Sequence, residues 1–246
     1  MLSDQGVAVK IQDLKKSFGK IEALAGVSID FAPGILHGII GPAGAGKTTL
    51  LRLMLSLLER DSGHIQYYID SRGVEFKNIM PNAAYMPEKQ SLYADLSIEE
   101  HLKFFASMYG LDHRTYLDRS HDLLEMTRLS KFLDRPAGKL SGGMYKKLGL
   151  MCALLRAPMI MFLDEPTNGV DPISRREFWD ILNDSTKNHV TIIMTTAYMD
   201  EAERCECVHL LDDGHVIGSG EPTSLLASAS VENFDEFFIE RDKDRA

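Results

Sequence analysis

The sequence predicts an α/β domain with a mainly parallel sheet, an N-terminal antiparallel β region and a helical subdomain inserted into the core. Three observations predict this class. Strand-type and helix-type segments alternate along the chain, a glycine-rich loop separates one strand from one helix, and one apolar run ends in two acidic residues. We place the core in residues 1–90 and 139–246 and the helical insert in residues 91–138.

The N-terminal segment has the pattern of short strands joined by turns. Val7, Val9 and Ile11 are apolar with polar residues between several of them, and residues 17–20 indicate a turn. Two short β-type runs follow and end at Pro33-Gly34. This arrangement favours an antiparallel region.

The rest of the core alternates between strands and helices. In chain order we expect a strand at 35–40, a helix at 48–58, strands at 64–69 and 83–86, a helix at 142–155, a strand at 159–163, a helix at 175–183, a strand at 190–195, a short helix at 199–204, a hairpin of 208–211 with 215–217, and a terminal helix at 235–246. Within the insert we expect helices at 98–109, 114–126 and 130–133, the first begun by a capping box of Ser97 and Glu100.

Composition limits the class of protein. The chain has 246 residues, of which 44% are hydrophobic and 26% charged, as in soluble globular domains. A formal net charge of −9 argues against a general binder of nucleic-acid backbones. The N-terminus lacks the pattern of a signal peptide, and no apolar run approaches the length of a membrane span, so we expect any action at a membrane to go through a partner.

The three cysteines indicate a reducing compartment. Their number is odd, and no secretory signal accompanies them. Cys205 and Cys207 could form a pair of thiol ligands, but no second cysteine or histidine pair stands at zinc spacing. We therefore expect no zinc site of the usual paired pattern.

The glycine-rich loop predicts a phosphate site. It reads Gly41-Pro42-Ala43-Gly44-Ala45-Gly46-Lys47-Thr48 and fits the G-x-x-x-x-G-K-[ST] pattern between a predicted strand and helix. Curled backbone N–H groups and a helix N-terminus suit an anion, Lys47 would reach the β- and γ-phosphates, and Thr48 would ligate Mg²⁺. The alternative is a turn that merely caps a helix. The loop predicts a P-loop NTPase core, but kinases, GTPases and motors share it.

The acidic pair follows a strand of apolar residues. Asp164 and Glu165 stand at its carboxyl end, where ligands of open α/β sheets bind. Asp164 would hold Mg²⁺ through water, and Glu165 is the candidate general base toward the γ-phosphate. Alone, the pair could equally be a solvated acidic turn.

Leu140-Ser141-Gly142-Gly143-Met144 separates the possible families. A serine and two glycines opening a helix offer N–H groups and a hydroxyl to a second phosphate. With this motif the chain resembles the ABC ATPase family from Phe18 to about Ser219. The residues around Pro136 and Asp171 resemble those of ATPase subunits of bacterial multidrug exporters. The resemblance implies that two ATPase domains close around two ATP molecules, each bound between them.

The resemblance also implies roles for individual residues. Phe18 would stack on adenine, Asp171 would communicate across the dimer, and the segment between Glu88 and Ser141 would dock onto a transmembrane partner. The full expected set for nucleotide binding is Phe18, Gly41, Pro42, Ala43, Gly44, Ala45, Gly46, Lys47, Thr48, Thr49, Ser141, Gly142, Gly143 and Asp171. Lys47 and Glu165 are the expected catalytic residues, and Thr48, Glu88 and Asp164 the expected Mg²⁺ ligands.

Two positions depart from the family pattern. Glu88 stands where a glutamine is usual, and Ala197 stands where the family has a histidine that donates to the γ-phosphate. Ionised Glu88 can ligate Mg²⁺ but cannot donate a hydrogen bond. The loss of one preorganised donor costs about 10²–10³ in rate. We therefore expect normal binding of Mg-ATP and slow hydrolysis.

The expected function is that of an ATP-binding subunit that powers export. ATP hydrolysis at a dimer interface would drive a separate transmembrane permease at the cytoplasmic face of the bacterial inner membrane, with a second ABC ATPase domain, identical or different, as partner. One alternative is a soluble ABC-type ATPase acting on nucleic acid or ribosomes, which the acidic charge does not favour. The other is a kinase or GTPase, against which the Ser141 and Asp171 motifs speak.

Overall fold

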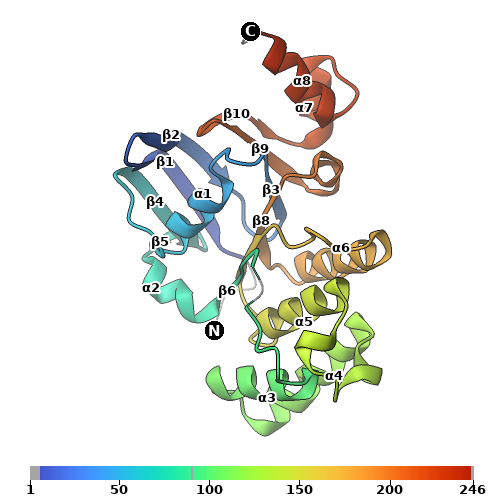
Figure 1. The fold of residues 1–246 in the computed structure, drawn as a ribbon. Helices are drawn as coiled ribbons and strands as arrows, with labels where there is room; N and C mark the ends of the chain where they lie inside the picture. Colours follow the sequence, from blue (N-terminus) through green and yellow to red (C-terminus); the bar gives the residue numbers. More distant parts are fainter. Residues whose placement is uncertain (1–5, 90, 245–246) are drawn as a thin grey trace.

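The computed structural model describes residues 6–89 and 91–244. Within that range the strands form two sheets, and most helices pack on the larger sheet or gather in the insert (Figure 1). The ends of the predicted core, residues 1–5 and 245–246, and residue 90 at its internal boundary lie outside the described residues.

The larger sheet is mainly parallel, as predicted. Its order is β10-β9-β3-β8-β7-β6, and only the β9–β10 hairpin is antiparallel. The strands are β3 (Leu36–Ile40), β6 (Ala83–Met86), β7 (Ile160–Asp164), β8 (Thr191–Thr196), β9 (Cys207–Asp212) and β10 (His215–Gly220). Every residue of β3, β7 and β8 is buried, because helices and the second sheet cover both faces. Continuous apolar runs in the sequence therefore identified these strands.

The smaller sheet is antiparallel, with the order β2-β1-β4-β5. Its strands are β1 (Ala8–Phe18), β2 (Ile21–Phe31), β4 (Ser62–Ile69) and β5 (Arg72–Val74). The predicted turn at 17–20 is shorter than expected, because β1 continues to Phe18, which pairs with Ile21. The two short runs after this turn form one strand, β2. The inner face of this sheet packs against α1 (Lys47–Met54) and the larger sheet in one apolar cluster.

The core helices follow the predicted order with different bounds. The helix α1 ends at Met54, four residues before the expected end, whereas α6 (Pro172–Lys187) is longer at both ends. It starts earlier than expected because Asp171 caps its N-terminus. The segment 199–204 is a 3-10 helix. The last helices are α7 (Pro222–Ala229) and α8 (Phe234–Asp244). The sequence pattern did not predict β5, the short α2 (Phe76–Ile79) or α7.

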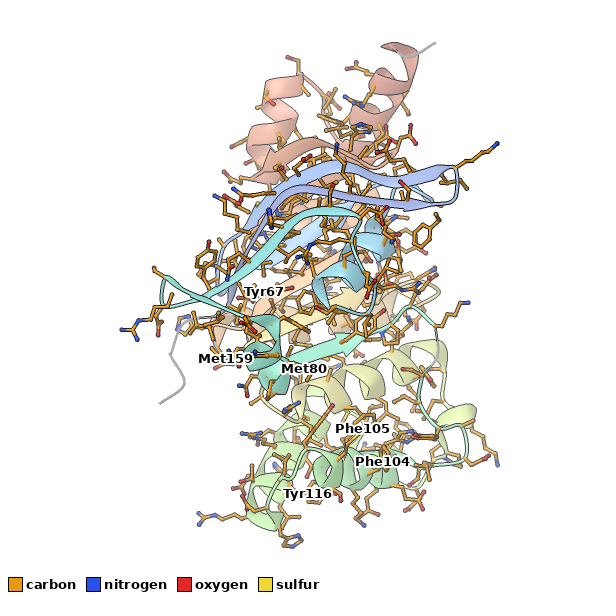
Figure 2. All side chains as sticks on the ribbon, turned by 90° about the vertical axis from the view of Figure 1, so that its left-hand side faces the viewer. Tyr67, Met80, Phe104, Phe105, Tyr116 and Met159 are labelled. Atoms are coloured by element: carbon orange, nitrogen blue, oxygen red, sulfur yellow. The ribbon has the colours of Figure 1, made fainter. Side chains whose placement is uncertain are left out.

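The insert consists of α3 (Ile98–Met108), α4 (His113–Thr127) and two short 3-10 helices, which pack on α5 (Gly142–Leu154). The segment predicted as a helix at 130–133 is one of these 3-10 turns, Ser130–Phe132. The capping box is present, with Ser97 Oγ accepting from the Glu100 N–H and Glu100 accepting from the Ser97 N–H. Figure 2 places Phe104, Phe105 and Tyr116 in this insert, away from Tyr67 in the antiparallel sheet.

In the part of the chain that the structure describes, no helix combines the length and the apolar character that crossing a bilayer requires.

Candidate functional site

The glycine-rich loop joins β3 to α1 at the carboxyl end of the parallel strands. Gly44 and Gly46 have positive φ, 86° and 104°, a conformation that glycine adopts without a steric cost. A Cβ added at Gly41 would lie 2.0 Å from the Leu211 carbonyl oxygen, so only glycine fits there. Residues 42–44 are exposed, and their loop leads directly into the first turn of α1. This loop can therefore present backbone N–H groups to an anion.

Lys47 is buried at the first position of α1. Its Nζ donates to the carbonyl oxygens of Gly41 (2.7 Å) and Pro42 (3.0 Å) and lies 3.3 Å from Glu165 Oε1. The side chain folds back over the loop, so its ammonium group stands where a phosphate held by the loop amides would meet it. Ala45 is buried behind the loop, and Thr49 is half-buried in α1.

Thr48 and Asp164 meet although 116 positions separate them in the chain. The Thr48 hydroxyl donates to Asp164 Oδ1 at 2.9 Å, and the Thr195 hydroxyl donates to the same oxygen at 2.8 Å. These hard oxygen atoms at the edge of the loop fit Mg²⁺, which prefers oxygen ligands. The sequence prediction did not include Thr195; the two consecutive threonines at the end of its buried strand were the available signal.

Glu165 has a strained backbone at the end of β7, with φ of 45°. Its N–H donates to Thr195 Oγ1 at 3.0 Å, and its Oε2 accepts from the Ala197 N–H at 3.1 Å. The carboxylate is thereby directed toward Lys47. Ala197 is exposed beside it and offers a backbone N–H but no side-chain donor.

Glu88 joins this edge through Lys146 of α5. The Lys146 ammonium donates to the backbone oxygens of Glu88 (3.1 Å) and Glu165 (3.4 Å). Burial lowers the pKa of Lys146, while Glu88, Asp164 and Glu165 oppose this effect. The Glu88 side chain itself is exposed. The sequence prediction did not include Lys146, because no local pattern indicates which distant segments contact this side chain.

Ser141, Gly142 and Gly143 open α5 at some distance from the phosphate loop. Ser141 is exposed, and its Oγ accepts from the Met144 N–H at 3.3 Å. Gly143 is buried, because a Cβ there would lie 2.3 Å from the Ser174 side chain and 3.2 Å from Asp171 Oδ2. Between this surface and residues 41–49, no hydrogen bond or ion pair forms within the described ranges. The surface faces outward.

Asp171 caps α6 beside that surface. Its Oδ1 accepts from the N–H groups of Ile173 (3.1 Å) and Ser174 (3.0 Å). The Ser174 N–H is the main cause of the lowered pKa of Asp171. The structure therefore brings Asp171 to the Ser141–Gly143 surface rather than to Lys47.

Phe18 lies at the end of the β1–β2 hairpin. Its side chain is 49% exposed, so it is not part of the apolar core. Lys16 Nζ stands 5.6 Å from its ring centre. The carbonyl of Ala23 in the same hairpin abuts Gly46, which places this hairpin beside the phosphate loop.

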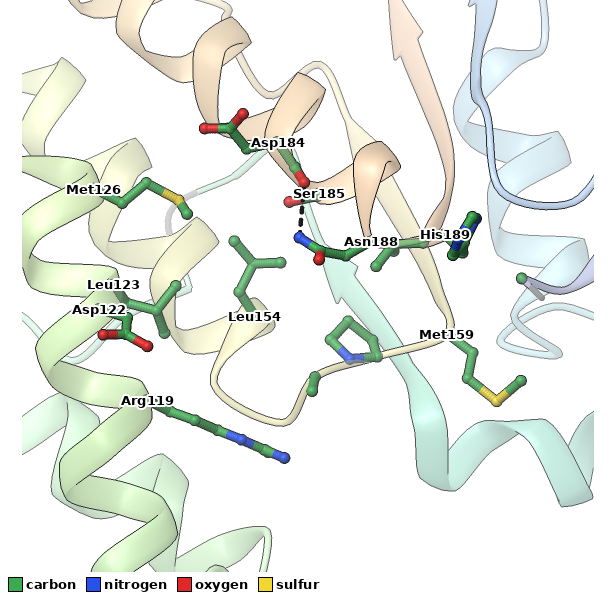
Figure 3. Close-up of a pocket in the computed structure, with 14 residues that line it drawn as sticks. Arg119, Asp122, Leu123, Met126, Leu154, Met159, Asp184, Ser185, Asn188 and His189 are labelled. Atoms are coloured by element: carbon green, nitrogen blue, oxygen red, sulfur yellow. Dashed lines mark hydrogen bonds between the residues drawn. The ribbon is translucent and has the colours of Figure 1, made fainter. Parts of the chain in front are cut away.

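A separate cavity of about 730 Å³ lies between α4, the segment joining α5 to β7, and the end of α6. Arg119, Leu123 and Met126 of α4 face Asp184 and Asn188 across it (Figure 3). None of the predicted site residues lines this cavity.

The chain is similar to known proteins over most of its length. The family model described as "ABC transporter" matches residues 24–168. The chain is 38% identical over 234 residues to the "Probable multidrug ABC transporter ATP-binding protein YbhF" of Escherichia coli (strain K12), covering 92% of this chain but only 39% of that protein. It is 34% identical over 221 residues to the "Nod factor export ATP-binding protein I" of Rhizobium sp. (strain N33), covering 89% of this chain and 73% of that one.

A solved structure described as "Structure of ATP binding subunit of ABC transporter" has a similar fold. Its TM-score is 0.82 at 28% identity, and the match covers 94% of this chain and 98% of that one.

Proposed function

Because this chain belongs to the ABC transporter family, we propose that it is an ATP-binding subunit that hydrolyses Mg-ATP at a dimer interface and powers export through a separate transmembrane partner. The single observation that carries the proposal is the meeting of Lys47, Asp164 and Glu165 at one edge of the parallel sheet. The names of the relatives, a multidrug transporter protein and an export protein, support export.

The phosphate loop and Phe18 would bind the nucleotide. The backbone N–H groups of residues 43–48 would hold the phosphates, and Lys47 would exchange its bonds to two carbonyl oxygens for bonds to phosphate oxygens. The exposed Phe18 ring would stack on the adenine. The turn of the loop would be shaped by Pro42, Ala43, Gly44 and Ala45. Thr49 directly follows the loop in α1.

Thr48 and Asp164 would hold Mg²⁺, with Glu88 as a third oxygen donor. The ion would neutralise part of the phosphate charge when bound. Thr195 fixes the orientation of the Asp164 carboxylate through its hydroxyl.

Glu165 would orient and deprotonate the attacking water. Thr195 and the Ala197 N–H hold its backbone and carboxylate in place, and Lys47 Nζ lies 3.3 Å from that carboxylate. Ala197 provides no side-chain donor for the charge that develops on the γ-phosphate. We therefore propose that this chain turns over ATP slowly at its own phosphate loop.

Ser141, Gly142 and Gly143 would contact the ATP held by a second ATPase domain, and Asp171 would transmit the state of that site. The exposure of Ser141 and Gly142 supports this role. A competent second domain would make up for slow hydrolysis at this chain's loop, so we favour a heterodimeric pairing.

The helical insert would dock onto the transmembrane partner at the cytoplasmic face of the bacterial inner membrane. Tyr93, Phe104 and Met108 are exposed there, and the Tyr93 and Phe104 rings are in edge contact at 5.4 Å. Such a cluster of exposed aromatic and apolar side chains is typical of protein interfaces.

Steady-state ATPase assays of the whole chain and its Ala197→His variant test the proposal. We expect the variant to be faster by about 10²–10³-fold, with unchanged ATP affinity, because the imidazole restores one donor. The double variant Ala197→His/Glu165→Gln is the control and should be inactive. Equal rates with and without the histidine would contradict slow hydrolysis, and absence of ATP binding would contradict the function itself.

A further inference from the structure

One cysteine and two histidines gather at the end of the parallel strands opposite the phosphate loop. His37 is near the start of β3, and Cys207 and His209 are near the start of β9. One potential ligand atom from each lies within 4.8 Å of the other two. The proposed nucleotide site uses none of these side chains.

The register of the strands brings the three side chains to one face. His37 pairs directly with Cys207 across the parallel ladder, and His209 follows two residues later on the same strand, so it points the same way. Ser219 of β10 pairs with His209 on the other side. Figure 1 shows β10, β9 and β3 side by side. Three adjacent strands therefore build the cluster.

The outer nitrogen of each histidine is already engaged by the protein. His37 Nε2 donates to the Ala32 carbonyl oxygen at 2.9 Å, which leaves its Nδ1 unprotonated and facing His209. His209 Nδ1 lies 3.0 Å from Ser219 Oγ, which can accept a hydrogen bond from Nδ1–H. In that tautomer the pair matches the way metal-binding histidines are held, with the outer N–H fixed by a second partner and the inner lone pair directed at the metal; without a metal the two inner nitrogens can share a hydrogen bond.

The spacing of the inner atoms suits a tetrahedral ion. His37 Nδ1 and His209 Nε2 are 3.2 Å apart, close to the roughly 3.3 Å expected between two nitrogen atoms at about 2.0–2.1 Å from zinc. Cys207 Sγ is 3.9 Å from His209 Nε2, slightly longer than the approximately 3.6 Å of a tetrahedral site. Zinc binding would therefore require Cys207 Sγ to move about 0.3 Å closer to His209 Nε2.

Burial and access also favour a bound cation. His37 and His209 are 1% and 2% exposed, so the protein rather than bulk solvent surrounds their imidazole nitrogens. Cys207 and His209 line an open cavity of about 670 Å³ between the two sheets, through which an ion can arrive. The Phe31 ring packs against both imidazoles and keeps the far side apolar.

We propose that His37, Cys207 and His209 bind one Zn²⁺ ion between the two sheets, with a water molecule from the cavity in the fourth position. A thiolate with two imidazoles favours Zn²⁺ over Mg²⁺ or Ca²⁺, which prefer oxygen. The Cys207 thiol gives up its proton to solvent on binding, so each ion bound releases one proton. The site joins β3, β9 and, through Phe31, the antiparallel sheet. It does not depend on ATP.

Metal binding to the whole chain tests the site. The chain is treated with a chelator, freed of nucleotide, and titrated with Zn²⁺ against a chromophoric chelator. Titration with Co²⁺ then reports the ligands by absorption. We expect one ion per chain, a thiolate-to-cobalt charge-transfer band, and at least about tenfold weaker binding in Cys207→Ser and His209→Gln. Cys205→Ser is the matched control, because Cys205 is buried beside Gly38 on the side of β3 opposite His37. This variant should bind Zn²⁺ as tightly as the natural chain.

A readout without metal guards against misfolded variants. In chelator, Cys207→Ser should melt with the same cooperativity as the Cys205→Ser control, and added Zn²⁺ should raise the melting temperature of the control alone. Zn²⁺ should also protect Cys207 from alkylation. No stoichiometric binding, an intact charge-transfer band in Cys207→Ser, or alkylation of Cys207 at an unchanged rate would each overturn the proposal.

Discussion

At the residue scale, the phosphate loop depends on glycines for two different reasons. Gly41 is required by space, since any side chain would meet the Leu211 carbonyl oxygen, whereas Gly44 is required by its backbone, with open space around it. The same motif thus contains one steric and one conformational constraint.

Replacement of these two glycines by alanine should separate the constraints. We expect Gly41→Ala to lower the free energy of unfolding by about 3 kcal/mol or more, because β9 must move. Gly44→Ala should lower it by about 1 kcal/mol, the cost of a positive φ at alanine. Urea unfolding of both variants measures the difference, and equal losses would contradict the assigned contact.

Lys146 gives a prediction about pH. Burial lowers its pKa in the folded chain below the unfolded value of 10.5, so the unfolded chain binds more protons between the two values. The contribution of Lys146 to stability therefore rises with pH across that window. Relative to Lys146→Met, the natural chain should become more stable as the pH rises toward 10.5, measured by urea unfolding at several pH values. A difference that stays constant with pH would refute this.

At the element scale, the insert is attached to the core by a charged contact. Lys147 of α5, whose side chain is 7% exposed, donates to Glu177 of α6 at 2.8 Å and to the Thr127 carbonyl oxygen of α4 at 2.9 Å. Arg128 contacts the same glutamate from solvent, with 78% of its side chain exposed. One buried cation therefore ties three helices together.

Removal of the shared acid should cost more than removal of the exposed base. We expect Glu177→Ala to lower the free energy of unfolding by about 1–3 kcal/mol, because Lys147 is left buried without its carboxylate. Arg128→Ala should change it by less than about 0.5 kcal/mol, as for exposed ion pairs. Thermal or urea unfolding of the two variants and the natural chain measures these free-energy changes. The reverse order would show that the buried lysine is satisfied by Thr127 alone.

At the scale of the whole molecule, the two predicted phosphate-binding surfaces favour assembly with a second ATPase domain. Lys47 and its neighbours lie at one site, and Ser141 with Asp171 at another that faces outward. A single chain cannot bring both surfaces to one nucleotide without a neighbour. Under the proposed function, the insert would transmit the motion of that pairing to the transmembrane partner.

ATP should therefore promote association of the chain when hydrolysis is blocked. We expect Glu165→Gln with Mg-ATP to shift toward dimer in light-scattering chromatography, either with itself or with a competent partner domain. Adding Ser141→Glu should abolish the shift, because the new carboxylate would face the partner's γ-phosphate. Ser228→Glu on α7 adds the same charge elsewhere and should leave the shift intact. Loss of the shift in both charge variants would contradict a specific role for Ser141.

The sequence alone determined those features that a contiguous segment specifies. The phosphate loop, the acidic pair after a buried strand and the serine–glycine opening of α5 are each local patterns, and their order gave the fold class. Hydrophobic period and capping residues likewise gave most of the helices and strands. The short β5 and α2 were not predicted because their patterns span too few residues.

Only the tertiary structure decided which distant residues meet. Strand order and register placed Thr195 on Asp164, the Ala197 N–H on Glu165, and Lys146 against the backbone of Glu88. The same register paired Cys207 with His37, and His209 joins them because side chains two residues apart on a strand share a face. Contacts of this kind depend on how separate segments pack, and no local pattern encodes that packing.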